Sequence, residues 1–289
     1  MAKSKKPNNT LQGKVAVVTG ASRGIGKGIA EALGECGATV YVTGRTEDKS
    51  TATVPLSGTI PATAQAVTKL GGIGIAVRCD HSRDEDIEAL FEQVKREQGR
   101  LDILVNNVWS GYQAMQRSEP GFQTKFWKMP PQFWDTMFAV GVRAHYVASV
   151  YAAQLMIPQH AGLIANISFA AGQKYTSNVA YGVSKAAVDR MALDMAHELR
   201  DQGVTVVAIW PGTVKTEMLA KHIGTKKTAY IESPRFVGRG IAALAADPKV
   251  LEKTGQIWNT RQLAHDYQFT DTDGTLPPIK KQWLPKESE

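Results

Sequence analysis

The sequence predicts an α/β protein, with one doubly wound parallel sheet of about seven strands and helices on both faces, in a single domain. Two observations support this prediction. Short continuous apolar runs, which are typical of strands buried on both faces, alternate along the 289 residues with stretches of helical periodicity. No internal repeat or linker divides the chain, and α/β proteins of this length are often single domains.

The predicted strands are apolar segments closed by polar residues or glycine. They cover residues 15–18, 39–42, 73–79, 101–105, 163–167, 204–209 and 256–258. Helical patterns fill the intervals, from residue 25 to Gly37, then over 62–70, 84–98, 132–157 and 181–202, with a further helix after 233. Ser82 or Asp84 is expected to cap the helix that ends at residue 98. Polar loops are expected at 46–61 and 213–233, and an aromatic-rich excursion at 109–131.

Both ends of the chain carry basic residues. Residues 1–11 are expected to form a disordered basic tail, 12–265 the folded domain, and 266–289 a polar, Pro-rich C-terminal extension. The tails contribute part of the net charge of +7, and such runs are usually solvated. No element groups basic residues with stacking aromatics, so we expect no nucleic-acid partner. The positive charge would instead favour the approach of an anionic cofactor.

The two cysteines, Cys36 and Cys79, have no spacing that indicates a metal site or a disulfide framework. They are typical of small buried apolar residues in a reducing compartment. No apolar stretch approaches the length needed to cross a bilayer, and the N-terminus lacks the apolar region of a secretory signal. We therefore expect a cytoplasmic protein with no membrane span and no metal.

Polar and glycine residues follow the predicted strands at the point where each strand ends. In chain order they are the glycine loop 20–26, Arg45, Asp80, Asn106, Ser168 and Pro211-Gly212. Ligands of parallel sheets bind at the carboxyl ends of the strands, so these residues are expected to share one site.

The glycine loop, Gly20-Ala-Ser-Arg-Gly24-Ile-Gly26, joins a buried strand to an amphipathic helix. Its backbone amides and the helix N-terminus can hold a pyrophosphate. A lone glycine cluster is often only a tight turn, but its position between strand and helix favours a dinucleotide.

The end of the second strand bears on the choice of cofactor. An acidic residue there would accept hydrogen bonds from a 2′-hydroxyl, but this chain has Arg45, with Arg23 in the glycine loop. Two guanidinium groups suit a 2′-phosphate, which favours NADP(H) and leaves NAD(H) possible. Either arginine can also be read as an ordinary surface charge.

Tyr181 and Lys185 stand four residues apart at the start of a predicted helix, so they share one face. The ammonium of Lys185 is expected to lower the pKa of the Tyr181 phenol and to make it a proton donor or acceptor for a hydroxyl or carbonyl. Alone, this pair is more often a packed ring beside a solvated amine.

Together these motifs resemble the set of the short-chain dehydrogenase/reductase family. The matching segments are Thr19-Gly-Ala-Ser-Arg-Gly-Ile-Gly26, Asn106-Asn107, Ser168, Tyr181-x-x-x-Lys185 and Pro211-Gly212, in order and at the usual separations. Further segments, at 140–146, 181–183, 196–199, 209–212 and 271–274, resemble the branch of that family called dehydrogenase/reductase SDR family member one. The resemblance implies a Rossmann-like fold, hydride transfer between NADP(H) and a small-molecule carbonyl or alcohol, and a homodimer or homotetramer.

The resemblance also implies a role for each matching residue. Tyr181 would exchange a proton with the substrate oxygen, Lys185 would lower its pKa and hold the nicotinamide ribose, and Ser168 would hydrogen-bond the substrate oxygen. Asp80 would bind the adenine amino group and Asn106 would lie along the cofactor. The other expected cofactor contacts are Gly20, Ser22, Arg23, Gly24, Ile25, Gly26, Arg45, Pro211, Gly212, Val214 and Thr216.

Three positions depart from the family pattern. Gly141 replaces an Asn that helps to hold a proton-relay water, Phe169 follows Ser168 where many relatives have a second serine, and Trp109 stands near the usual Ala-Gly. The indole either shapes an apolar substrate pocket or packs under the aromatic excursion. Two alternatives to an NADP(H) enzyme stay open, namely an NAD-dependent alcohol dehydrogenase and a cofactor-binding protein with little turnover.

Overall fold

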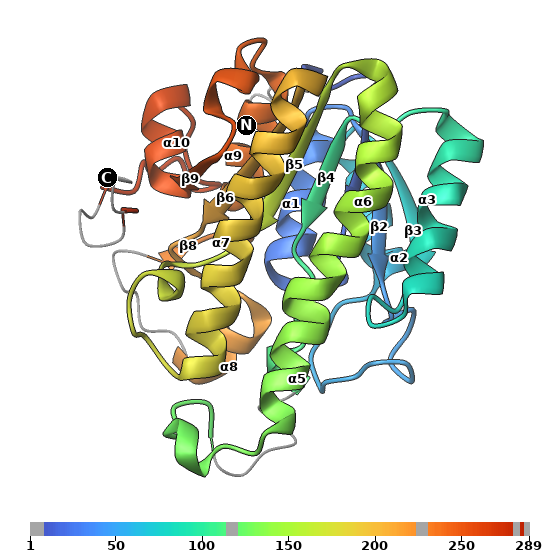
Figure 1. The fold of residues 1–289 in the computed structure, drawn as a ribbon. Coiled ribbons are helices and arrows are strands. Elements are labelled where there is room, and N and C mark those ends of the chain that lie inside the picture. The colour runs from blue at the N-terminus through green and yellow to red at the C-terminus, as the bar shows by residue number, and fades with distance from the viewer. Residues whose placement is uncertain (1–8, 114–120, 224–230, 280–283, 286–289) are drawn as a thin grey trace.

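The computed structural model describes residues 9–113, 121–223, 231–279 and 284–285. Seven strands form one parallel sheet in the order β3-β2-β1-β4-β5-β6-β9 (Figure 1). The strands are β1 (Val15–Val18), β2 (Thr39–Gly44), β3 (Ile73–Arg78), β4 (Ile103–Asn106), β5 (Gly162–Ile167), β6 (Val204–Trp210) and β9 (Gln256–Asn259). The predicted doubly wound parallel sheet is confirmed.

Helices cover both faces of the sheet, because side chains from successive positions of each strand enter opposite cores. Val18 of β1 packs in the core under α1 (Gly24–Glu35), α2 (Ile60–Lys69) and α9 (Pro234–Ala246). Val17 packs in the opposite core, under α3 (Asp84–Gln98), α6 (Ala144–Met156) and α7 (Val179–Leu199). This layering leaves the carboxyl ends of the strands free to build a site.

Helix α1 packs unusually closely on α9. A Cβ at Gly28 would lie 2.2 Å from the carbonyl carbon of Pro234, and a Cβ at Gly238 would lie 2.6 Å from Cβ of Ala32. Only glycine allows this approach of two helix backbones. The contact fixes the helix that carries the glycine loop.

Three predicted segments differ from the structure. The long helix 132–157 consists of α5 (Gln132–Phe138), a π-helical turn (Ala139–Arg143) and α6, because the chain inserts a wider turn there. The loop 213–233 contains β7 (Thr213–Val214), α8 (Glu217–Ile223) and β8 (Ile231–Glu232). A helix that the sequence analysis does not predict, α10 (Thr260–Tyr267), follows the last strand of the sheet.

The predicted cap of α3 is also wrong. The N-cap position is Arg83, whose side chain makes no capping bond. Ser82 instead donates its hydroxyl to the Asp80 carboxylate at 2.7 Å, and Asp86 accepts from the Asp80 amide at 2.9 Å. The local loop therefore uses Ser82 to order the end of β3.

Several predictions fall outside the described residues. These are the tail up to residue 8, the middle of the aromatic excursion at 114–120, and the C-terminal lysines. The domain boundaries stay predictions. Among the described residues, no helix combines the length and apolarity needed to cross a membrane.

A buried ion pair between Arg261 and Glu232 connects the segments that follow β6. Arg261 Nε lies 2.5 Å from Glu232 Oε1, and their side chains are 6% and 0% exposed. The other carboxylate oxygen accepts from the Gly212 amide at 2.9 Å. Burial raises the pKa of Glu232, and Arg261 opposes that rise. The pair thereby holds the loop after β6 against β8 and α10.

Replacing Arg261 by Met should lower the free energy of unfolding by about 3–5 kcal/mol, because it leaves the Glu232 carboxylate buried without its cation. Urea unfolding measures the change. The control is Arg190→Met, which removes an exposed ion pair with Asp194 and should cost much less. Equal losses in the two variants would show that the buried pair does not hold this region.

Candidate active site at the carboxyl edge of the sheet

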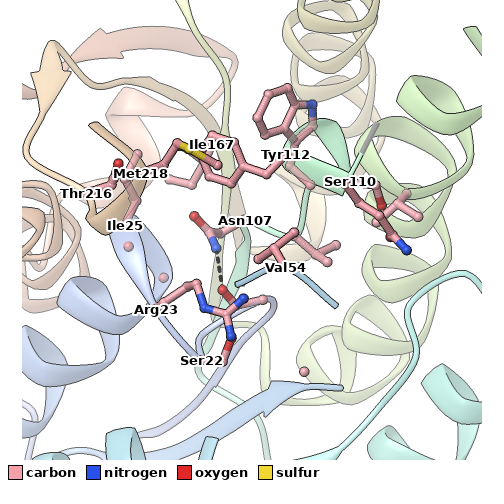
Figure 2. Close-up of a pocket in the computed structure, with 18 of the residues that line it drawn as sticks. Ser22, Arg23, Ile25, Val54, Asn107, Ser110, Tyr112, Ile167, Thr216 and Met218 are labelled. Carbon is pink, nitrogen blue, oxygen red and sulfur yellow. Dashed lines mark hydrogen bonds between the residues drawn. The ribbon is translucent and has the colours of Figure 1, made fainter. Parts of the chain in front are cut away.

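A cavity of about 480 Å³ lies where the strands of the sheet end (Figure 2). Its walls come from the loops that follow β1, β2, β3, β4, β5 and β6, as predicted for a parallel sheet. The predicted site residues that line it are Gly20, Ser22, Arg23, Gly24, Ile25, Gly26, Arg45, Asp80, Ser168, Tyr181, Lys185, Pro211, Gly212, Val214 and Thr216.

Asn106 is the predicted site residue that the structure does not bring to the cavity. Its side chain is fully buried below it and donates to Ser149 Oγ at 2.9 Å and Asn166 Oδ1 at 2.8 Å. The next residue, Asn107, lines the cavity and donates to the Thr19 carbonyl at 2.8 Å. Successive residues at a strand end point in opposite directions, so the two asparagines have different roles.

The glycine loop brings the backbone close to the cavity. A Cβ at Gly26 would lie 2.5 Å from both Asn107 Nδ2 and the Gly20 carbonyl oxygen, so glycine is required there. The N-cap side chain of α1, Arg23, makes no capping bond, and the first turn has no acidic residue. The Gly24 amide instead donates to Glu217 Oε2 at 2.9 Å. Because a carboxylate already lies at the N-terminus of α1, the backbone amides of this helix can donate to an anion. The loop therefore fits a pyrophosphate.

Two arginines, Arg23 and Arg45, line the cavity beside the glycine loop. Arg23 donates to the Gly58 carbonyl at 3.0 Å, and burial lowers its pKa while Glu217 opposes this. Arg45 donates to Gln113 Oε1 at 3.1 Å and lies 3.8 Å from Asp80. Burial opposes ionisation of Asp80, but hydrogen bonds from Ser82 hold its pKa below the usual value. The cavity thus presents two cations here, with the Asp80 carboxylate near Arg45 and the Glu217 carboxylate acting on Arg23.

Tyr181, Lys185 and Ser168 come together at the start of α7. The N-cap residue Asn178 accepts from the Tyr181 amide at 2.9 Å, which starts the helix at this point. Lys185 Nζ lies 5.9 Å from the Tyr181 ring centroid and donates to the Ile167 carbonyl at 3.2 Å. Ser168 Oγ donates to the Lys185 carbonyl at 3.2 Å. Burial lowers the pKa of Lys185 to about 8, and Asp189 opposes this.

The predicted lowering of the Tyr181 pKa is wrong. Burial, helped by Tyr112, raises the pKa of the Tyr181 phenol above its usual value. The ring is packed among Trp109, Phe122 and Phe169, with centroid distances of 5.7, 5.3 and 6.4 Å. Aromatic rings solvate a phenolate poorly, and the Lys185 ammonium is directed to a carbonyl. The phenol therefore keeps its proton at neutral pH.

Comparison with known proteins identifies the family. The family model described as short chain dehydrogenase matches residues 14–227. The chain belongs to the short-chain dehydrogenase/reductase family. It is 44% identical over 284 residues to "Dehydrogenase/reductase SDR family member 1" of Mus musculus, with 93% of this chain and 86% of the relative covered. The same-named human protein is 43% identical over 278 residues, covering 91% and 85%. The predicted branch is thus confirmed.

Solved structures of this family share the fold. A short chain dehydrogenase from Mycobacterium thermoresistibile aligns with a TM-score of 0.76 at 23% identity, over 91% of this chain and 90% of that one. A metagenomic short-chain oxidoreductase in complex with NADP aligns with a TM-score of 0.67 at 30% identity, over 86% and 97%.

Two departures from the short-chain dehydrogenase/reductase pattern, Trp109 and Gly141, meet in space. A Cβ at Gly141 would lie 3.2 Å from Trp109 Cδ1, so the missing side chain makes room for the indole. The indole lines the cavity and also packs against Tyr112 and Phe122, with centroids 5.3 and 6.1 Å away. The indole thus packs against the rings of the aromatic excursion, as one interpretation expected, and the role of Trp109 in a substrate pocket stays a prediction. Other lining residues that the motifs did not indicate include His81, Tyr112, Gln113, Val140, Glu217 and Met218.

Gly141→Asn should lower the free energy of unfolding by about 1–3 kcal/mol, because the added side chain meets the Trp109 indole. Combining it with Trp109→Ala should give a coupling of about 1 kcal/mol or more in a double-mutant cycle measured by urea unfolding. The control is Gly121→Asn, since a Cβ at Gly121 meets nothing within 4 Å. If the changes in unfolding free energy of the two substitutions are additive, the absence of a side chain at residue 141 is not what makes room for the Trp109 indole.

Proposed function

We propose that this protein is an NADP(H)-dependent oxidoreductase that interconverts a carbonyl and an alcohol, with Tyr181 as the general acid and base. One observation carries the proposal. A single cavity contains the anion-accepting glycine loop, two arginines, and the group of Tyr181, Lys185 and Ser168. Separate sites would fit a simple nucleotide-binding protein, whereas this arrangement brings acid/base groups to a dinucleotide.

The proposed cofactor contacts follow the walls of the cavity. The glycine loop and the N-terminus of α1 hold the pyrophosphate. Arg23 and Arg45 face the 2′-phosphate and Asp80 the adenine. Pro211, Gly212, Val214 and Thr216 lie toward the nicotinamide. Asn107, rather than Asn106, borders the cofactor. When bound, NADP(H) supplies or accepts the hydride.

Each catalytic side chain has one task in carbonyl reduction. The protonated phenol of Tyr181 gives its proton to the substrate oxygen as the carbonyl carbon gains hydride. Ser168 turns its hydroxyl from the Lys185 carbonyl to that oxygen and orients it. Lys185 provides positive charge beside the phenolate that forms. Because burial raises the pKa of Tyr181, the phenol is protonated at neutral pH and has a proton to give.

The proposed substrate is an apolar small-molecule carbonyl. Trp109, Tyr112 and Phe169 line the cavity, and Phe122 lies 5.3 Å from the Tyr181 ring. Such walls favour a flat or bulky apolar group next to the carbonyl. The alternative of an NAD-dependent alcohol dehydrogenase has one supporting observation, because Asp80 reduces the positive charge at Arg45.

We also propose that the protein is a homodimer or homotetramer assembled through α6 and α7. Both helices expose large apolar side chains, Tyr146 and Val150 on α6 and Val183 and Leu193 on α7. Exposed large apolar side chains on a helix surface favour association. The cytoplasmic location stays a prediction.

Tyr181→Phe should reduce turnover by roughly a thousandfold, because the proton donor is lost. The Kd for NADPH should change by less than about twofold, since the ring stays in place. Loss of NADPH absorbance with aldehydes, diketones and ketosteroids measures turnover. Tyr175→Phe, at an exposed ring, is the matched control. Retained turnover in Tyr181→Phe would exclude the mechanism, and a wild type that binds NADPH but reduces no carbonyl would favour the cofactor-binding alternative.

Arg45→Gln should lower kcat/KM for NADPH by roughly tenfold or more and leave the value for NADH within about threefold, because a charge-assisted bond to the 2′-phosphate is worth about 1.5–3 kcal/mol. Arg78→Gln removes an equal charge from an exposed side chain near the same edge and should affect neither cofactor selectively. If Arg45→Gln lowers both values equally, the NAD-dependent alternative gains support.

A further inference from the structure

The first turn of α1 is capped by a residue distant in the sequence. The Gly24 amide donates to Glu217 Oε2 at 2.9 Å, across 193 residues. Neither Arg23 nor any acidic residue of α1 supplies this acceptor. Free amides and the helix dipole make this position attractive to a negative charge. The carboxylate of Glu217 fills that role.

Glu217 is also the first residue of α8, which forms part of the cavity wall. Thr216 accepts from the Leu219 amide at 3.3 Å and so caps α8. A Cβ at Gly24 would lie 3.5 Å from Thr216 Cγ2 and 3.8 Å from Glu217 Oε2, which shows how closely the start of α8 covers the glycine loop. In Figure 2 Thr216 and Met218 lie near Ile25, the second residue of α1. The hydrogen bond thus ties α8 to the loop.

We propose that Glu217 is an internal competitor for the cofactor pyrophosphate, and that displacement of its carboxylate releases α8 from α1. This inference rests on the proposed function for the identity of the cofactor. One amide proton cannot serve a carboxylate and a phosphate together, and two anions at this distance repel each other in a partly buried site. The pyrophosphate, with more charge and more acceptors, replaces Glu217.

Two consequences follow for the site. Cofactor affinity is lower than the glycine loop alone would give, because binding must break the contact between Glu217 and Gly24. Release of Glu217 also loosens the attachment of the start of α8, whose residues Met218 and Leu219 line the cavity. Cofactor binding is then coupled to the shape of the substrate end of the cavity.

The first experiment compares Glu217→Gln with the wild type by isothermal titration calorimetry. The variant should bind NADPH roughly tenfold more tightly, because the amide keeps its volume and loses the competing charge. Adenosine 2′-monophosphate, which lacks the pyrophosphate, should bind both proteins equally. Glu252→Gln, an exposed residue outside the cavity, removes the same charge and should bind NADPH like the wild type.

Unchanged or weaker NADPH binding by Glu217→Gln would overturn the proposal, because a carboxylate that merely caps α1 does not compete with the cofactor. An equal gain for adenosine 2′-monophosphate would also overturn it, since the effect would then be one of overall charge. If the wild type binds neither NADPH nor NADH, the proposed function fails, and inorganic pyrophosphate becomes the probe. Tighter pyrophosphate binding by the variant would still support the competition, and equal binding would refute it.

The second experiment follows amide hydrogen exchange of residues 217–223 in the full chain without cofactor. Glu217→Ala removes the acceptor and should speed exchange throughout α8, while Glu252→Ala should not. Adding NADPH to the wild type should speed exchange in the same segment. Unchanged exchange in Glu217→Ala would show that the carboxylate does not tether α8.

Discussion

The buried side chain of Asn106 joins the centre of the sheet to the helix layer beside it. It donates to Asn166 on β5 and to Ser149 on α6, at the level where β4 ends. Around it, Thr19 accepts from the Asn107 amide at 2.9 Å, and His145 Nε2 lies 3.0 Å from the Val108 carbonyl. Strands that stop inside a protein leave polar groups that need partners, and these side chains provide them. The loops that form the cavity begin at this edge of the sheet.

The acid/base group depends on a second constraint, which is burial. Lys185 is buried, and Tyr181 is half-buried among aromatic rings. This burial raises the pKa of the phenol and lowers that of the ammonium to about 8. Burial also raises the pKa of Asp189 to about 6, against a hydrogen bond from Trp210 Nε1 at 3.0 Å. Charges within this group are therefore sensitive to any anion or cation that enters the cavity. The environment favours a phenol that keeps its proton at neutral pH.

Sequence periodicity predicted the sheet and the layers, because those features follow from local patterns. The cavity wall was expected from the residues that follow each strand and from the resemblance to the family. The pairing of Tyr181 with Lys185 follows from the helical repeat in the same way. Features that depend on contacts between distant segments could not be read from the chain. Gly141 makes room for the Trp109 indole 32 positions away in the sequence, and Glu217 accepts from the Gly24 amide across 193 positions. The sign of the Tyr181 pKa shift was missed because it depends on which rings surround the phenol. Asn106 and Asn107 were not distinguished, since their directions depend on the exact end of β4.

The central claim is that hydride passes between NADP(H) and a carbonyl carbon in this cavity. Its most direct test is to incubate the protein and a reducible carbonyl with NADPH that carries deuterium at C4 of the nicotinamide, in separate samples for each of the two C4 positions. Mass spectrometry should find one deuterium on the alcohol carbon of the product from one sample and none from the other. A product without deuterium in both samples, or with deuterium from both, would contradict the account.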